Sequence, residues 1–218
     1  QKKVDNKKKI LFVGGGSEIA LKILNKLRKN YIYNLSRKKN KLYKENYIIK
    51  SYSNSNLDKK FKLINQNFDF VFIFNGNFEF STLSFLNEKK FLNLLNINLL
   101  APIRIVNKLI ANKLLSNNSK VFFLSSKAAN YAEIGNAYYS ISKNALNFAA
   151  NILNKENKKK KIKFITISAG LIESKMGKKV KQLINLNKKK SIHNLDTSIN
   201  NLVNFIKSTI KNKKTIKL

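Results

Sequence analysis

The positions of the glycines constrain the fold of this chain more than any other feature of its sequence. Six of its seven glycines fall just past apolar runs that have the length of buried strands. These six are Gly14, Gly15, Gly16, Gly76, Gly135 and Gly170. In open α/β sheets, ligands bind outside the carboxyl ends of the strands, where loops approach them closely and favour glycine. The glycines therefore predict a binding cleft along one edge of a sheet.

Strand-like and helix-like segments alternate along the chain. Strands are expected at Lys9–Val13, Tyr31–Ser36, Tyr47–Ser51, Asp69–Phe74, Lys120–Leu124, Lys163–Ser168 and Thr215–Leu218. Helices are expected after Ser17, at Leu57–Asn67, twice between Glu88 and Leu115, at Tyr138–Leu153 and at Thr197–Ile210, with 171–195 irregular. The alternation predicts an α/β fold, with a Rossmann-like, doubly wound parallel sheet of about seven strands and helices on both faces. Without a linker or repeat, residues 1–218 are expected to form a single domain.

Composition narrows the chemistry that the chain can carry. It has no cysteine and a single histidine, His193, so disulfides, Cys-ligated metals and a Ser-His-Asp hydrolase are not expected. We expect no metal site. No apolar run reaches the roughly 18–20 residues that span a bilayer, and no signal-peptide pattern opens the sequence. The expectation is a cytoplasmic protein that does not bind a membrane.

The net charge of +33 raises nucleic acid or an anionic membrane as a partner. The residues behind this charge argue otherwise, because the chain has 34 Asn and abundant Lys but only three Arg. This usage is typical of a strongly AT-biased genome at tolerant surface positions. Nucleic-acid surfaces favour Arg, which contacts bases and phosphates through two donors. We therefore expect no specific nucleic-acid binding.

The stretch from Val121 to Lys143 carries the strongest chemical signal. An apolar strand ends in two serines, and the helix that follows carries Tyr139 and Lys143 four residues apart. Residues at that spacing share one helix face, where an ammonium can lower the pKa of a phenol from its usual value of about 10. Such a phenol can donate or accept a proton at working pH. A chance pair in a Lys-rich chain, or a core aromatic at Tyr139, would give the same pattern.

A second signal lies at the first glycine turn. The strand Lys9–Val13 runs into Gly14-Gly15-Gly16-Ser17, after which apolar residues recur at helical spacing. A helix that begins directly after such a turn presents unpaired N–H groups and the positive end of its dipole. The turn is therefore a natural phosphate-binding site.

Together these segments resemble the short-chain dehydrogenase/reductase family over nearly the whole chain. The family's active site contains Asn, Ser, Tyr and Lys, with the last two in the pattern Tyr-x-x-x-Lys. Tyr139 to Lys143 fits this pattern, and Ser126 precedes Tyr139 by thirteen residues, as is usual in the family. Asn98 lies in the mid-chain helical region where the family has its Asn. The resemblance implies that Asn98, Ser126, Tyr139 and Lys143 are catalytic.

The resemblance also implies a dinucleotide site. The cofactor-binding residues would be Gly14, Gly16, Ser17, Glu18, Ile19, Arg37, Asn75, Gly76, Tyr139, Lys143, Gly170, Ile172 and Ser174. The glycine turn departs from the family pattern, since Glu18 and Ala20 occupy the places of its second and third glycines. A carboxylate at position 18 repels a pyrophosphate unless it turns away or caps the helix. This departure puts cofactor affinity in doubt more than the fold.

The end of the second strand indicates which cofactor is preferred. An acidic residue there would bind the ribose of NAD, whereas a basic one accommodates the 2′-phosphate of NADP. The chain has Ser36-Arg37-Lys38 and no carboxylate nearby, which favours NADP(H) over NAD(H). The planar fork of Arg37 suits a phosphate.

The function that the resemblance implies is an NADP(H)-dependent oxidoreductase that interconverts a carbonyl and an alcohol. Tyr139 would transfer the proton, Lys143 would lower its pKa and hold the nicotinamide ribose, Ser126 would orient the substrate oxygen, and Asn98 would position a water. The family also allows a homodimer or homotetramer. The small-molecule substrate is not readable; its walls are expected from 77–87, 127–138 and 171–195, including Phe78, Phe80, Phe85, Tyr131 and Ile134.

Two alternatives stay open at this stage. Glu18 and Ala20 are consistent with a degenerate family member that binds a nucleotide and acts as a regulatory or scaffold protein. A nucleic-acid-binding protein is supported by the charge alone.

Overall fold

A parallel sheet forms the centre of the computed structural model, which describes residues 7–131, 134–172, 174–183, 194–207 and 215–217. Its seven strands lie in the order β3-β2-β1-β4-β5-β6-β7. They are β1 (Lys9–Val13), β2 (Tyr31–Ser36), β3 (Glu45–Ile48), β4 (Phe68–Ile73), β5 (Leu115–Ser126), β6 (Lys163–Ala169) and β7 (Thr215–Lys217). This order confirms the expected Rossmann-like, doubly wound fold.

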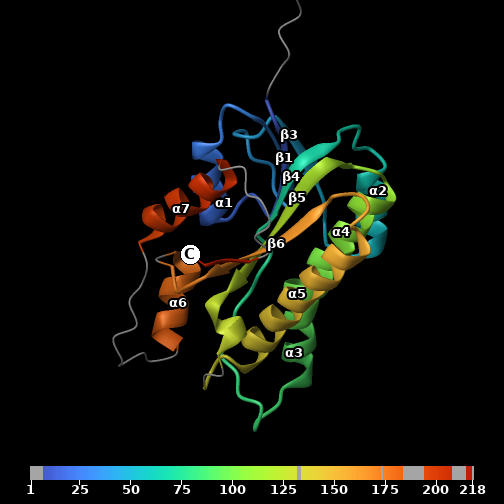
Figure 1. Cartoon of the computed structure of the whole chain (residues 1–218). Coiled ribbons are helices and arrows are strands. Elements are labelled where there is room, and N and C mark those ends of the chain that lie inside the picture. The colour runs from blue at the N-terminus through green and yellow to red at the C-terminus, as the bar shows by residue number, and fades with distance from the viewer. Residues whose placement is uncertain (1–6, 132–133, 173, 184–193, 208–214, 218) are drawn as a thin grey trace, which may run out of the picture.

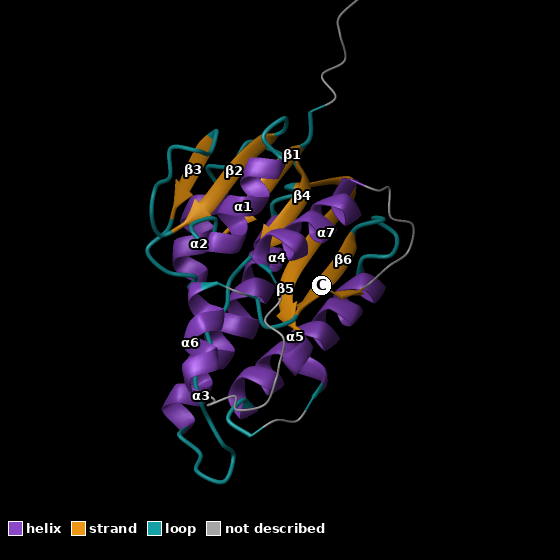
Figure 2. Cartoon of the chain, turned by 90° about the vertical axis from the view of Figure 1, so that its left-hand side faces the viewer, coloured by secondary structure: helices purple, strands orange, loops and turns teal. Residues whose placement is uncertain are grey.

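Helices cover both faces of the sheet (Figures 1 and 2). One face carries α1 (Glu18–Lys26) and α7 (Leu195–Lys207), and the other carries α2 (Asn54–Phe61), α4 (Ala101–Ala111) and α5 (Ala137–Glu156). The remaining helical segments are α3 (Glu88–Leu95), the π-helix η1 (Asn96–Leu100), the 3₁₀ turn η2 (Lys127–Asn130) and α6 (Lys175–Leu183).

The central strands of the sheet are largely apolar because both of their faces are covered. In β1, Leu11 and Val13 belong to the core on the α2, α4 and α5 side. Ile10 and Phe12 alternate with them and belong to the core on the α1 and α7 side. A strand buried on both faces therefore appears in the sequence as one continuous apolar run, which made β1 recognisable.

Several elements differ in extent from the sequence prediction. The third strand is Glu45–Ile48 and not Tyr47–Ser51, because it pairs with β2 in the register Tyr33 to Glu45. The following helix begins at Asn54, earlier than predicted. The fifth strand starts at Leu115, since Leu115 pairs with Phe68 across a register shift in β4. Pairing between strands set these boundaries, and a local pattern does not contain it.

The sequence prediction missed α6 entirely. Residues 171–195 were expected to be irregular, yet Lys175–Leu183 is helical. Ser174 caps this helix by accepting a hydrogen bond from the Gly177 N–H at 3.1 Å. The segment has four lysines and a glycine among its nine residues, and its few apolar residues did not indicate a helix from the sequence. His193 and Leu218 lie outside the described residues, as does part of the predicted helix at Thr197–Ile210.

One helical run in the described part of the chain, Glu88–Ala111, is long and apolar enough by length and composition to cross a membrane. It comprises α3, η1 and α4. Its Ile105, Val106 and Leu109 are fully buried in the core beneath the sheet. Packing in the core accounts for these apolar residues without a bilayer.

Candidate functional site

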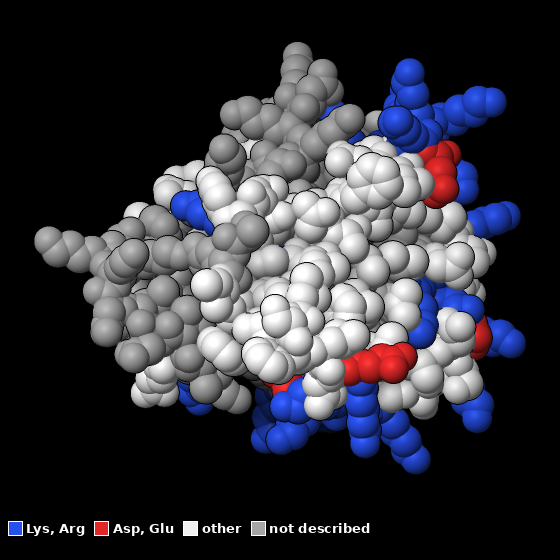
Figure 3. All heavy atoms as spheres, turned by 90° about the horizontal axis from the view of Figure 1, so that it is seen from below, with Lys and Arg blue, Asp and Glu red and all other residues white. Residues whose placement is uncertain are grey.

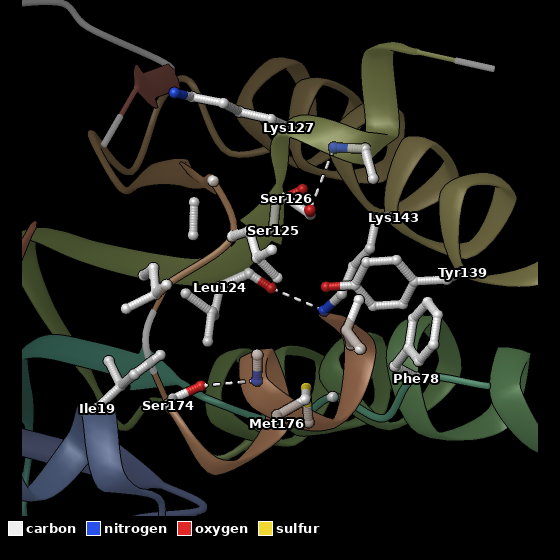
Figure 4. A pocket seen from close by; sticks show the side chains of 18 of the residues that line it. Ile19, Phe78, Leu124, Ser125, Ser126, Lys127, Tyr139, Lys143, Ser174 and Met176 are labelled. Atoms are coloured by element: carbon white, nitrogen blue, oxygen red, sulfur yellow. Dashed lines mark hydrogen bonds between the residues drawn. The ribbon is translucent and has the colours of Figure 1, made fainter. Parts of the chain in front are cut away.

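The carboxyl ends of the strands surround a cavity of about 750 Å³ (Figure 4). Its walls come from the glycine turn, the segment after β4, the end of β5, the start of α5 and the segment after β6. The predicted site residues that line it are Gly16, Ser17, Glu18, Ile19, Gly76, Ser126, Tyr139, Lys143, Gly170, Ile172 and Ser174. The fold therefore brings together side chains that are far apart in the sequence.

Ser126, Tyr139 and Lys143 occupy one wall of this cavity. Ser126 is the last residue of β5, and the other two lie one turn apart near the start of α5. Ser126 lies close enough to Tyr139 to lower the pKa of its phenol. The Lys143 Nζ lies 5.8 Å from the centre of the Tyr139 ring and donates to the Leu124 carbonyl at 2.8 Å. Figure 4 shows the phenol and the ammonium turned toward the same part of the cavity.

Burial perturbs both titratable groups of this wall. It raises the pKa of Tyr139, and the nearby Ser126 hydroxyl opposes the change only in part. It also lowers the pKa of Lys143 to about 8, because the buried ammonium loses its hydration. The prediction that Lys143 lowers the pKa of Tyr139 is wrong for this structure. The ammonium is satisfied by the Leu124 carbonyl, and burial outweighs any influence it has on the phenol.

Asn98 lies behind the cavity wall and is fully buried. Its Oδ1 accepts from the Asn77 N–H at 2.8 Å, and its Nδ2 donates to the Asn77 carbonyl at 3.0 Å and to the Ser142 Oγ at 2.9 Å. These bonds tie the segment after β4 to α5. Asn98 therefore holds the wall together and does not itself line the cavity.

The backbone around Asn98 explains how the amide reaches this position. Residues Asn96–Leu100 form one π-helical turn directly before Pro102, which lies in the first turn of α4. Proline has no N–H, so Pro102 cannot make the regular helical hydrogen bond. The wider π-helical turn can form at this place because that bond is already missing. A proline suits the first turn of a helix, where its missing N–H costs no hydrogen bond, and α4 starts there.

Ser142 was not singled out as a functional position by the sequence analysis. Its hydroxyl is fully buried, accepts from Asn98 and donates to the Tyr139 carbonyl at 2.7 Å. It therefore links Asn98 to the helix turn that carries Tyr139. The sequence signal for this role was its place one residue before Lys143, on the inner face of the helix.

The glycine turn is held by contacts within the chain. Gly14 has φ +75°, which favours glycine, and the Ser17 Oγ caps α1 by accepting from the Ala20 N–H at 3.2 Å. The carbonyl of Gly15 accepts from the Tyr43 hydroxyl at 2.7 Å, and a Cβ at Gly15 would lie 2.5 Å from that hydroxyl. Gly15 is thus required by Tyr43, whereas Gly16 has open space around it.

The residues around the turn fit a dinucleotide in two respects. The Oδ1 of Asn75 is buried without a hydrogen-bond partner among the described residues, and it lies beside Gly14. A Cβ at Gly76 would approach the Lys143 Nζ to 3.2 Å, so glycine keeps the ammonium accessible from the cavity. A bound group could satisfy the amide oxygen and reach the ammonium without displacing a side chain.

Three of the predicted cofactor residues lie off the cavity wall. Gly14 and Asn75 lie just behind it, and Arg37 is exposed at the end of β2. Arg37 lies close enough to Tyr52 to lower the pKa of that phenol, although burial raises it more and a hydrogen bond from Asn75 also lowers it. The adenosine end of a dinucleotide would therefore extend past the cavity toward β2.

Two of the side chains predicted for the substrate walls line this cavity. Phe78 lines the cavity and packs edge-on against Tyr139 with ring centres 5.5 Å apart, and Tyr131 lines it as well. Phe80, Phe85 and Ile134 do not line it and are 47%, 85% and 89% exposed. They lie on loops that turn outward, so their apolar character was misleading. Leu171, Met176 and Val180 take their place as wall residues.

Within the described residues, no group of three His, Asp or Glu side chains is arranged to hold a metal ion.

A sequence profile identifies the family. The profile of the short chain dehydrogenase family matches residues 54–185. The chain belongs to this family. Members of the family are oxidoreductases that bind NAD(P) and act on small molecules. A search of curated proteins finds no match.

Solved structures of the family share the fold. A short chain dehydrogenase family protein from Francisella tularensis subsp. tularensis SCHU S4 is 15% identical with a TM-score of 0.83, over 97% of each chain. A variant of actinorhodin polyketide ketoreductase with NADPH is 14% identical with a TM-score of 0.84, over 99% of this chain and 97% of that one. A short-chain dehydrogenase from Streptomyces avermitilis is 14% identical with a TM-score of 0.79, over 98% and 88%. At such identities the likeness concerns the fold alone.

Proposed function

We propose that this short chain dehydrogenase is an NADP(H)-dependent oxidoreductase that interconverts a carbonyl and an alcohol. One observation carries the proposal: Ser126, Tyr139 and Lys143 share a cavity with the glycine turn. A phenol, a hydroxyl and an ammonium suit proton transfer at an oxygen, and the turn suits a phosphate. A bound nicotinamide dinucleotide would supply hydride transfer to or from carbon.

Each polar residue of the wall has a role that its contacts support. Tyr139 donates its proton to the carbonyl oxygen in reduction and takes it back in oxidation. Its raised pKa keeps it protonated, as a donor must be. Ser126, which lines the same wall as Tyr139, orients the same oxygen and stabilises the charge that develops on it.

Lys143 and Asn98 act on the position of the cofactor and of Tyr139. The Nζ of Lys143 is accessible beside Gly76 and can donate to ribose hydroxyls. Asn98 and Ser142 hold the turn of α5 from which Tyr139 projects. Asn98 has its side-chain amide engaged with Asn77 and Ser142, so we assign it to maintaining the wall; a water held nearby would use its remaining lone pair.

The proposed cofactor site combines the cavity and the end of β2. Phosphates would meet the N-terminus of α1 at Gly16, Ser17 and Ile19, while Gly170, Ile172 and Ser174 would face the nicotinamide end. Gly14, Asn75 and Gly76 would support the middle. Arg37 is exposed where a 2′-phosphate would extend, which supports NADP(H) over NAD(H). Cofactor and substrate would then share one domain and one edge of the sheet.

The surface around the cavity supports an uncharged substrate. Phe74, Phe78, Leu171, Met176 and Val180 give the cavity apolar walls. Figure 3 views the molecule from the side of the strands' carboxyl ends, where residues other than Lys, Arg, Asp and Glu fill the middle and Lys or Arg side chains project mainly along the right and lower margins. A carbonyl compound with an apolar body fits these walls.

A homo-oligomer is also proposed. Phe148 and Ile152, one turn apart on α5, are 66% and 42% exposed. A second copy of the chain would cover this outward face.

The second candidate, a nucleotide-binding scaffold without turnover, is favoured by Glu18. Its carboxylate stands at the N-terminus of α1, where a pyrophosphate would bind. The polar wall of Tyr139, Ser126 and Lys143 has no use in such a protein, and so we favour the enzyme.

Titration with NADPH and NADH by fluorescence, followed by a panel of carbonyl substrates, separates these functions. The proposal predicts saturable NADPH binding, weaker NADH binding and turnover with an apolar carbonyl compound. NADPH binding without turnover on the whole panel favours the scaffold. Failure to bind either nucleotide contradicts both.

A further inference from the structure

Glu18 joins two helices that meet at the mouth of the cavity. It is the first residue of α1, and its Oε2 accepts from the backbone N–H of Lys175, the first residue of α6, at 3.0 Å. The two residues are 157 positions apart in the chain. Both line the cavity. The contact therefore bridges the glycine turn and the helix that closes the opposite side.

Neither helix needs this bond for its own capping. The Ser17 Oγ already accepts from the Ala20 N–H at 3.2 Å, so the Glu18 carboxylate is not required as the cap of α1. Likewise, the Ser174 Oγ accepts from the Gly177 N–H in α6 at 3.1 Å. The Ser174 cap leaves the Lys175 N–H without an acceptor in α6, and the Glu18 carboxylate accepts its hydrogen bond. The bond is thus a tertiary contact between helices.

The electrostatics of the contact favour a carboxylate. A hydrogen bond to an ionised acceptor is stronger than one between neutral groups. The carboxylate also lies at the positive ends of two helix dipoles, one from α1 and one from α6. A glycine at position 18, as in the family pattern, would supply none of this. The departure at Glu18 therefore adds an interaction that the pattern lacks.

The position of α6 determines the width of the cavity. This helix contributes Met176, Gly177 and Val180 to its wall. Its first turn packs so closely that a Cβ on Gly177 would collide with the Ile172 carbonyl oxygen. The helix is therefore held on one side by close backbone packing and on the other by Glu18. Losing the Glu18 bond would free the edge that faces the glycine turn.

We propose that Glu18 is a positioning residue that pins the first turn of α6 to the glycine turn and so sets the width of the cavity. A second consequence rests on the proposed function. The same carboxylate repels the negative charge of a pyrophosphate at the turn, so the contact that positions α6 also weakens nucleotide binding. Glutamine at this position keeps a carbonyl acceptor without the charge and separates the two effects.

Hydrogen exchange measured by NMR on the full-length protein tests the pin directly, without any nucleotide. Glu18→Ala should speed exchange of the Lys175 amide by about tenfold, because its only described acceptor is removed. Glu18→Gln should restore most of the protection. Glu88→Ala is the matched control, since Glu88 likewise opens α3 behind an N-cap residue, Asn87. It should leave the Lys175 amide unchanged. A wild-type exchange rate in Glu18→Ala overturns the pin.

Nucleotide affinity tests the second consequence separately. NADPH should bind Glu18→Gln about three- to tenfold more tightly than wild type, because a like charge is removed with the acceptor retained. Equal affinities for the two proteins overturn this half of the proposal. If no variant binds NADPH, the proposed function fails, while the exchange experiment still decides whether Glu18 pins α6.

Discussion

The two sides of the cavity are built in different ways. The side formed by β5 and α5 keeps the residue pattern of the family, and a connected set of bonds from Asn98 through Ser142 to the Tyr139 turn supports it. The glycine turn departs from the pattern, and its residues bond to other parts of this chain: Gly15 to Tyr43, and Glu18 to α6. In the proposed function, the first side carries the residues for proton transfer, and the second side determines how tightly the nucleotide binds.

The difference teaches where substitutions are tolerated. The proposed proton transfer would need Tyr139, Ser126 and Lys143 within a few ångströms of one oxygen, so few residues could change there. A phosphate site made of backbone N–H groups depends less on side chains. The turn can therefore exchange glycines for Glu18 and Ala20 as long as the backbone keeps its course.

The largest expected effect comes from breaking the first side at Tyr139. Tyr139→Phe removes the proton donor and should lower turnover by about 10²–10⁴-fold. The dissociation constant of NADPH should stay within about twofold, because the ring is retained. Steady-state kinetics and fluorescence titration measure the two quantities.

Tyr138→Phe is the matched control for that variant. The Tyr138 hydroxyl accepts from the Asn87 N–H at 2.6 Å, and Tyr138 does not line the cavity. Turnover close to that of wild type is expected. An equal loss in both variants would show that the helix, and not the proton donor, was damaged.

Removing the support behind this side should chiefly lower stability. Asn98→Ala leaves buried groups of Asn77 and Ser142 unpaired, which should reduce the free energy of unfolding by about 3 kcal/mol. Ser142→Ala should cost about 1 kcal/mol. A double-mutant cycle from urea unfolding should give a coupling energy between them, since the two side chains bond directly. If the losses in the two single variants simply added up in the double variant, the bond between Asn98 and Ser142 would not contribute to stability and the account would be contradicted.

Replacing Lys143 should raise the free energy of unfolding, whereas replacing Asn98 or Ser142 should lower it. The pKa of its ammonium falls from 10.5 to about 8 on folding, so near pH 7 the native state bears the full cost of the buried charge. Lys143→Met should therefore raise the free energy of unfolding by about 2 kcal/mol at pH 7, while abolishing turnover.

The pH dependence of this gain provides a check. Between pH 8 and 10.5 the unfolded chain keeps the Lys143 proton and the native protein loses it, so wild-type stability rises with pH. The advantage of the methionine variant should then shrink toward zero. Lys155→Met, an exposed position near the end of α5, should show no such trend. A gain that is the same at pH 7 and pH 10 would exclude burial as its cause.

The smallest effect is expected at the cofactor side. Arg37→Glu should weaken NADPH binding about tenfold without weakening NADH binding, because the guanidinium would contact only the 2′-phosphate and an acidic residue at this position can bind the ribose of NAD. Lys38→Glu makes the same charge change one residue away and should have a weaker effect. Equal losses in the two variants would indicate general charge attraction in place of a specific contact.

The sequence was sufficient for the first side of the cavity and insufficient for the second. Ser126 follows a continuous apolar strand, and Tyr139 and Lys143 share a helix face, so local patterns placed all three at one edge of the sheet. The bond between Glu18 and Lys175 joins residues 157 positions apart, and no local pattern contains it. The helix α6 was expected to be irregular because its lysine-rich sequence shows little apolar pattern and its contact with Glu18 comes from a distant part of the chain.

The pKa of Tyr139 shows a further limit of the sequence. The spacing of Tyr139 and Lys143 suggested that the ammonium lowers the pKa of the phenol. Burial raises it instead, and the ammonium donates to the Leu124 carbonyl. Burial and competing acceptors depend on tertiary packing, which the spacing of two residues does not report.

Isotope transfer tests the proposed reaction most directly. The protein is incubated with NADPH deuterated at nicotinamide C4 and with the best carbonyl substrate of the panel, and the product alcohol is analysed by mass spectrometry. The account predicts one deuterium on the carbinol carbon with wild type and almost none with Tyr139→Phe. Nucleotide binding without deuterium transfer to any carbonyl compound would contradict it.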